Sequence, residues 1–282
     1  MNFLFPVLAA VLQASSSIID KMTLSIKRVT YRTYNGISFP LIFIFTLIIF
    51  FLIRPDFSLS LFNTKLVIFL LISTIISLIT NLLYYRALKK DLLSEMQTFS
   101  LLSHIPLIAA ASLFFLDERN YFVISLAIIS ALSLVWSHYE RHHFRISKKT
   151  FPFFLWIIFL APFGGIINKI ILETLNPISM QLIRDFLILL VFIPLFYKDI
   201  KRAPKKAYLF LAITNILTTI AWILYFFSYQ RFGIVYTVLL FSLEPILVYL
   251  ASLVLLKEKL NYKKLISFII ILITITLSQI IK

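Results

Sequence analysis

The segment Thr33–Ile53, TYNGISFPLIFIFTLIIFFLI, runs for 21 residues without a charged side chain. The hydrocarbon core of a bilayer is roughly 30 Å thick, and an α-helix of about 20 apolar residues crosses it. A helix also satisfies its backbone polar groups within the segment, as lipid requires. The segment therefore predicts a membrane-spanning helix.

Nine further segments of similar length and composition lie along the rest of the chain. The ten expected spans are Phe3–Met22, Thr33–Ile53, Leu66–Tyr85, Met96–Leu116, Asn120–Tyr139, Phe151–Ile170, Leu175–Tyr197, Ala207–Tyr229, Phe232–Leu256 and Leu265–Ile281. The seventh is the weakest, because Arg184 and Asp185 interrupt it. The predicted fold class is therefore an all-α integral membrane protein with ten transmembrane helices.

The overall composition supports this division. Apolar residues make up 61% of the chain, charged residues 14%, and the mean hydropathy is +0.98. A water-soluble fold of this size would have to hide more apolar surface than its interior can hold. The chain has no cysteine, which excludes disulfides, thiolate metal sites and cysteine nucleophiles.

Short sequence matches indicate an internal repeat. Ile18–Lys21 (IIDK) recurs as Ile166–Lys169 (IINK), and Ser103–Pro106 (SHIP) recurs as Ser242–Pro245 (SLEP). Leu116–Arg119 (LDER) recurs as Leu256–Lys259 (LKEK), in the same order. These matches predict two five-helix repeats, residues 1–139 and 151–282, joined by a basic linker loop at residues 140–150. An odd number of helices per repeat inverts the second copy, which is a common arrangement in transporters.

The distribution of basic residues tests the number of helices. The connections after helices 1, 3, 5, 7 and 9 carry 20 of the 27 Lys and Arg residues, and the other connections with the C-terminus carry 5. A missed or invented span would scramble this alternation. Cytoplasmic loops are rich in Lys and Arg, so the rule places the basic loops inside and both termini outside. Dispersal of the +15 net charge among loops also argues against nucleic acid as a partner.

Three local signatures resemble those of the drug/metabolite transporter superfamily, specifically its ten-helix EamA-like family. They are Tyr84–Leu88 (YYRAL), Pro106 followed by LDER, and Glu244-Pro245 followed by LKEK. The resemblance implies transport of small metabolites or drugs by alternating access without ATP hydrolysis. It also implies cytoplasmic termini, in conflict with the charge rule. The Trp-Gly common in helix 1 of the family is Gln13-Ala14 here.

Polar residues recur at helical spacing within several spans and are the candidate cavity residues. They form stripes at Ser73, Ser77, Thr80 and Tyr84; at Gln97, Ser100 and His104; at Asn215, Thr218, Trp222, Tyr225 and Tyr229; and at Thr237, Phe241 and Glu244. Interhelical hydrogen bonding and aromatic packing are the alternative roles for the Ser, Thr, Trp and Tyr positions.

Ionisable groups deep in the bilayer carry the strongest prediction. Glu244 lies near the middle of its span, where a carboxylate must be paired, protonated or facing water. His104 occupies the matching position of the first repeat and can titrate near neutral pH. Arg184 is a candidate for recognising substrate charge, with Asp185 adjacent but unable to face it on an ideal helix. Pro106, Pro245 and the Pro162–Gly165 segment are expected to break their helices beside these groups.

These features together predict a secondary active transporter of a small metabolite or drug in the cytoplasmic membrane, with proton coupling or exchange left open. The predicted substrate and coupling residues are Glu244, His104, Gln97, Thr237, Arg184, Asn215, Trp222, Tyr225 and Tyr84. A membrane-embedded lipid-modifying enzyme and a lipid flippase of the same fold are the alternatives. No enzymatic activity, catalytic residue, cofactor or metal is expected, and His142-His143 are taken as part of a solvated basic loop. The expected partners are the substrate, protons and lipid, for a monomer or homodimer.

Overall fold

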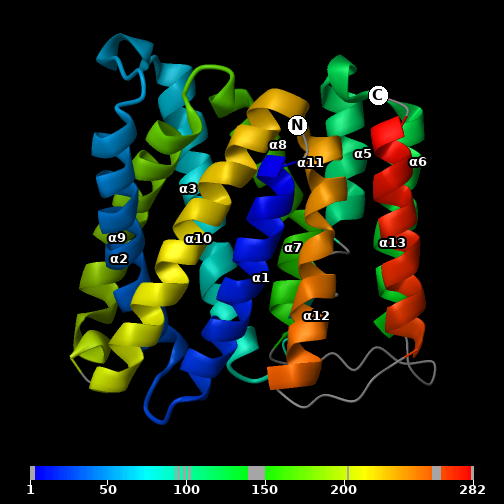
Figure 1. Cartoon of the computed structure of the whole chain (residues 1–282). Coiled ribbons are helices and arrows are strands. Elements are labelled where there is room, and N and C mark those ends of the chain that lie inside the picture. Colours follow the sequence, from blue (N-terminus) through cyan, green and yellow to red (C-terminus); the bar gives the residue numbers. More distant parts are fainter. Residues whose placement is uncertain are drawn as a thin grey trace.

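The computed structural model describes residues 4–91, 93, 96–97, 100, 103–138, 150–201, 203–255 and 262–280. These residues form an all-α bundle, and no strand occurs among them (Figure 1). The fold class predicted from the sequence is confirmed at this level.

The helices follow the predicted segments closely. They are α1 (Leu4–Ser25), α2 (Tyr31–Ile53), α3 (Thr64–Leu88), α5 (His104–Phe114), α6 (Tyr121–His138), α7 (Phe151–Phe159), α8 (Ala161–Leu172), α9 (Pro177–Ile200), α10 (Lys205–Phe232), α11 (Ile234–Phe241), α12 (Leu243–Leu255) and α13 (Tyr262–Ile280), with short 3₁₀ turns η1 (Leu59–Leu61) and η2 (Leu116–Glu118). Side-chain oxygens of Thr30, Asn63 and Asn176 cap the starts of α2, α3 and α9. Such caps bond backbone amides that a helix leaves unpaired in its first turn.

Two of the predicted spans are each divided into two helices. α7 and α8 meet at a bend of 42°, and α11 passes into α12 at Ser242. Pro162 and Pro245 lie in the first turn after these breaks, and Pro106 lies in the first turn of α5. Proline is tolerated there because its missing N–H would have no partner within the helix. The breaks therefore fall where the sequence placed them.

Among the described residues six spans are long and apolar enough to cross a membrane: α1, α2, α3, α9, α10 and the joined α11–α12 segment, Ile234–Leu255. The bent α7–α8 pair adds a seventh if it is counted as one span. Within the described residues, three shorter apolar helices accompany them, at His104–Phe114, Tyr121–Ser137 and Leu265–Ser278. The chain is thus a multi-pass membrane protein. Large apolar side chains cover the outside of the bundle, such as Leu52 and Val254, each 77% exposed. Exposed apolar surface on this scale is suited to lipid contact.

The helices pack so that α1 occupies the middle of the bundle, against α10 and α12 (Figure 1). α2 packs against α9, and α6 against α13, at opposite sides. The start of α1 and the end of α13 lie at the same end of the bundle. The connections from α1 to α2 and from α9 to α10 lie at the other end.

Two lysines cap helices at the end of the bundle that carries those connections. Lys21 Nζ of α1 donates to the carbonyl oxygens of Leu88 and Asp91, at 2.8 and 2.6 Å. Lys89 Nζ, after α3, donates in return to the carbonyl oxygen of Leu24. Burial lowers the pKa of Lys89 below its ordinary value, and the neighbouring Lys90 adds to the effect. Part of the basic charge therefore stabilises helix ends.

Two acidic residues, Asp117 and Glu118, stabilise helix ends at the opposite end of the bundle. Glu118 accepts hydrogen bonds from the amides of Ile234 and Val235, at 2.6 and 3.1 Å, and so caps α11. Lys169 of α8 pairs with Glu118 at 2.7 Å and with Asp117 at 2.8 Å. Gly233 precedes α11 with φ of +84°, and a Cβ there would lie 2.5 Å from a Glu118 carboxylate oxygen. The LDER signature thus joins three helices through one carboxylate.

Candidate functional site

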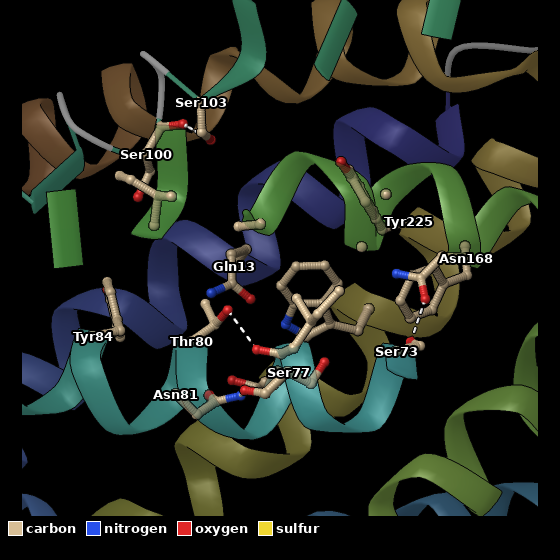
Figure 2. Close-up of a pocket in the computed structure, with 18 of the residues that line it drawn as sticks. Gln13, Ser73, Ser77, Thr80, Asn81, Tyr84, Ser100, Ser103, Asn168 and Tyr225 are labelled. Atoms are coloured by element: carbon tan, nitrogen blue, oxygen red, sulfur yellow. Dashed lines mark hydrogen bonds between the residues drawn. The ribbon is translucent and has the colours of Figure 1, made fainter. Parts of the chain in front are cut away.

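A cavity of about 320 Å³ lies inside the bundle, and its wall includes residues of α1, α2, α3, α5, α7, α8, α9, α10, α11 and α12. Figure 2 shows Gln13 of α1 pointing toward Ser77 and Thr80 of α3 across this space. The volume is suited to a small molecule, and polar groups are interspersed with aromatic ones.

Glu244 lies in the cavity wall at the start of α12, halfway along the Ile234–Leu255 span. Its Oε1 atom accepts hydrogen bonds from Gln97 Nε2 at 3.0 Å and from Ser17 Oγ at 3.2 Å. Glu244 is 8% exposed, and no basic group among the described residues lies within ion-pair distance of its carboxylate. Two neutral donors therefore hold it without fixing its charge.

The polar stripe on α3 lies along the same cavity. Ser73, Ser77, Thr80 and Tyr84 all line it, as the helical spacing predicted. Ser73 Oγ donates to Asn168 Oδ1 at 2.6 Å (Figure 2), and Trp156 Nε1 donates to Thr80 Oγ1 at 2.7 Å. Part of the stripe thus bonds neighbouring helices, while the stripe as a whole borders the cavity.

Arg184 and Asp185 border the cavity from α9 with separate partners. Asp185 accepts hydrogen bonds from Thr46 Oγ1 at 2.9 Å and from Gln181 Nε2 at 2.9 and 3.0 Å. Arg184 Nη2 donates to Ser77 Oγ, and its guanidinium carbon lies 5.2 Å from the centre of the Phe226 ring. Neighbours on a helix point in different directions, so each has found partners on another turn or helix.

Seven of the nine predicted site residues line this one cavity: Glu244, His104, Gln97, Arg184, Trp222, Tyr225 and Tyr84. His104 starts α5, and no hydrogen bond joins it to Glu244. Trp222 and Tyr225 stack edge to face at 5.2 Å, and the Tyr225 hydroxyl bonds Tyr229 at 2.8 Å. These two aromatic residues therefore both pack together and face the cavity.

Thr237 and Asn215 lie outside the cavity wall. Thr237 Oγ1 donates to the Gly233 carbonyl oxygen at 2.7 Å, and Asn215 Nδ2 donates to the Leu211 carbonyl oxygen at 2.7 Å. Both side chains are buried, at 0% and 1% exposed. Each polar group bonds the backbone carbonyl four residues earlier in the chain, a pattern common for these residue types.

The stripe on α1 is the one that sequence reasoning missed. Gln13, Ser16, Ser17 and Asp20 follow one another at i, i+3, i+4 and i+7, the spacing used for the other helices. Gln13 lines the cavity and Ser17 bonds Glu244. Asp20 is 1% exposed and accepts hydrogen bonds from Tyr34, from Tyr85 at 3.4 Å and from Thr214 at 2.5 Å. Asn168 and Gln181 are further cavity residues that lay outside the predicted set.

Comparison with known proteins agrees with this architecture. A model of the EamA-like transporter family matches residues 149–279, the second half of the chain. No curated protein sequence matches significantly. A solved structure titled only "Crystal structure of protein" is similar over 99% of this chain and 96% of its own, with 13% identity and a TM-score of 0.74. That likeness shows a shared fold. The chain is therefore a multi-pass membrane protein whose second half matches the EamA-like transporter family, the family that its sequence motifs resemble.

Proposed function

We propose that this protein is a secondary active transporter that moves a small metabolite or drug across the cytoplasmic membrane by alternating access. The observation that carries the proposal is the cavity of about 320 Å³, lined by polar stripes and holding the buried carboxylate of Glu244. Ionisable residues deep in a bilayer are costly, and they commonly mark substrate or proton pathways.

The proposed architecture has ten membrane spans in two inverted repeats, residues 1–139 and 151–282, and the linker 140–150 lies outside the described residues except for Thr150. Helix packing supports this architecture, because corresponding helices of the two halves make corresponding contacts. α1 packs against α10 and α12, and the corresponding helix of the second repeat, α8, packs against α3 and α5. Inverted repeats place a binding site at the interface of the two halves, where this cavity lies.

Proton coupling is proposed to act through Glu244. The carboxylate joins α12 to α1 through Ser17 and to the helical segment before α5 through Gln97. Protonation at Oε2 makes that oxygen a donor and removes the charge assistance from both hydrogen bonds to Oε1, so these bonds weaken when the charge is lost. A change in hydrogen bonds between helices of different repeats is suited to shift the balance between two access states. His104, on the same cavity, offers a second group that can exchange protons.

A transport assay tests the proposal. Purified protein in proteoliposomes is given a metabolite mixture under an imposed pH gradient, and the internal contents are analysed by mass spectrometry. At least one small molecule should accumulate with the gradient and stop accumulating when a protonophore collapses it. For an exchanger, preloaded substrate should accelerate uptake instead. Contents identical to those of empty liposomes under both conditions would contradict transport.

A further inference from the structure

Arg184 is a buried cation that forms no ion pair with any residue the structure describes. Its side chain lies in the cavity wall and the residue is 8% exposed. One nitrogen, Nη2, donates to Ser77 Oγ, while Nε and Nη1 have no hydrogen-bond partner. Within the described residues the ion pairs are those of Lys169, and Asp185 is turned toward Thr46 and Gln181. Burying charged donors without partners is strongly unfavourable, so such donors call for a ligand.

Unpartnered acceptors lie on the same cavity. The Oε1 atoms of Gln13 and Gln181 are buried and have no hydrogen-bond partner. Gln13 comes from α1, and Gln181 lies one turn before Arg184 on α9. The Phe226 ring stacks below the guanidinium, next to Trp222 at 5.7 Å. The missing partner therefore has to supply an anionic acceptor, a hydrogen-bond donor and some apolar surface.

We propose that Arg184 binds the carboxylate of the transported molecule, and that the same molecule donates a hydrogen bond from a hydroxyl or amino group to Gln13 or Gln181. A monoanion fits better than a phosphate dianion, because Asp185 and Glu244 share the cavity wall with Arg184, the one arginine among its described lining residues. The assignment rests on the proposed transport function and narrows it to one substrate class.

Binding to the purified full-length protein in detergent tests the assignment. The probes are small aromatic and aliphatic carboxylates with their primary amides, mandelate and mandelamide among them, and inorganic phosphate. Ligand-induced shifts in the thermal unfolding midpoint give the relative affinities. Carboxylates should stabilise the wild type, and the amides and phosphate should not. Mandelate, which carries a hydroxyl donor, should bind more tightly than phenylacetate.

Variants at two arginines identify the residue responsible. Arg184→Gln should weaken carboxylate binding at least tenfold, because a charge-assisted hydrogen bond to the anion is lost. Arg184→Lys should retain part of the binding, since the charge stays and the planar donor geometry is lost. Arg231→Gln makes the same chemical change at an exposed arginine at the end of α10 and should bind as the wild type does.

Three results would overturn the assignment: no carboxylate binding to the wild type, equal binding of carboxylates and amides, or undiminished binding to Arg184→Gln. If gradient-driven uptake of neutral or cationic metabolites accompanies any of these, transport stands and only the substrate class fails. Carboxylate binding without movement across the bilayer would leave the site intact and remove the transport function.

Discussion

At the scale of single residues, the wall of the cavity is defined by polar groups whose partners are incomplete. Glu244 is held by two neutral donors, and Arg184 keeps two donor nitrogens unpaired. By contrast, Lys169 forms ion pairs with both Asp117 and Glu118 at the end of the bundle. The distinction separates ionisable groups that stabilise the fold from those available to a ligand or a proton.

Replacing the central carboxylate by its amide should separate coupling from stability. Glu244→Gln keeps an oxygen that can accept from Gln97 and Ser17, so the fold and substrate binding should persist while pH-gradient-driven transport is lost. Proteoliposome uptake with and without the gradient measures this, alongside thermal unfolding in detergent. The exposed Glu173, at the end of α8, gives the matched control Glu173→Gln.

The pH dependence of the Glu244→Gln variant decides between the two roles. Normal transport with an unchanged response to the gradient would remove Glu244 from coupling. A lower unfolding temperature, with transport reduced only in proportion, would mean that the carboxylate serves mainly to hold α12 against its neighbours.

At the scale of elements, the first turn of α11 depends on the carboxylate of Glu118, a residue far from α11 in the sequence. The break after α10 leaves the first amides of α11 unpaired, and Glu118 accepts from two of them. Because Lys169 also needs this carboxylate, one side chain connects α8, η2 and α11. The two acidic residues of this cluster differ greatly in burial, with side chains 71% exposed for Asp117 and 3% for Glu118.

That difference predicts unequal effects of removing the two carboxylates. Glu118→Ala should lower the free energy of unfolding by about 3–5 kcal/mol, since it leaves Lys169 and two amides buried without their main acceptor. Asp117→Ala should cost less than about 1 kcal/mol, because water already solvates and screens this pair. Unfolding of both purified variants in detergent gives the order, and equal losses would contradict the capping role.

At the scale of the whole molecule, the two ends of the bundle differ in charge. The basic connections predicted from the sequence include those after α1, α3 and α9, and the start of α1 and the end of α13 lie at the opposite end. An even number of membrane crossings follows from that placement of the helix ends. Reporter fusions at the two termini should therefore report the same side of the membrane. Opposite sides would mean that the bundle crosses the bilayer an odd number of times.

Orientation is decided by a separate labelling experiment. The positive-inside rule places the 139–150 loop, of which residues 139–149 lie outside the described residues, in the cytoplasm. The chain has no cysteine, so Ser147→Cys introduces a single thiol. An impermeant maleimide should leave it unlabelled in intact cells and should label Ser58→Cys, in the exposed connection after α2. The reverse pattern would establish the orientation implied by the family resemblance, with both termini in the cytoplasm.

Much of this architecture could be predicted from the amino-acid sequence. Long uncharged segments predicted the helices, because lipid leaves the backbone few alternatives to a helix. Proline positions predicted the breaks at Pro162 and Pro245, since proline lacks an amide hydrogen and disrupts a helix interior. Periodicity also identified which face of α3 is polar, and that face does line the cavity.

Only the tertiary structure decided which polar faces meet. Helical spacing defines a stripe but not the neighbour that it faces, so the stripe of Gln13 on α1 could not be joined to α3 and α9 in advance. Helical spacing also could not show that the side chains of Thr237 and Asn215 donate to backbone carbonyl oxygens four residues earlier. A polar side chain can either face a cavity or bond the nearby backbone, and the sequence does not distinguish the two. The burial and the unpaired nitrogens of Arg184 depend on its contacts with side chains of α3 and α10, and these elements come together only when the bundle packs.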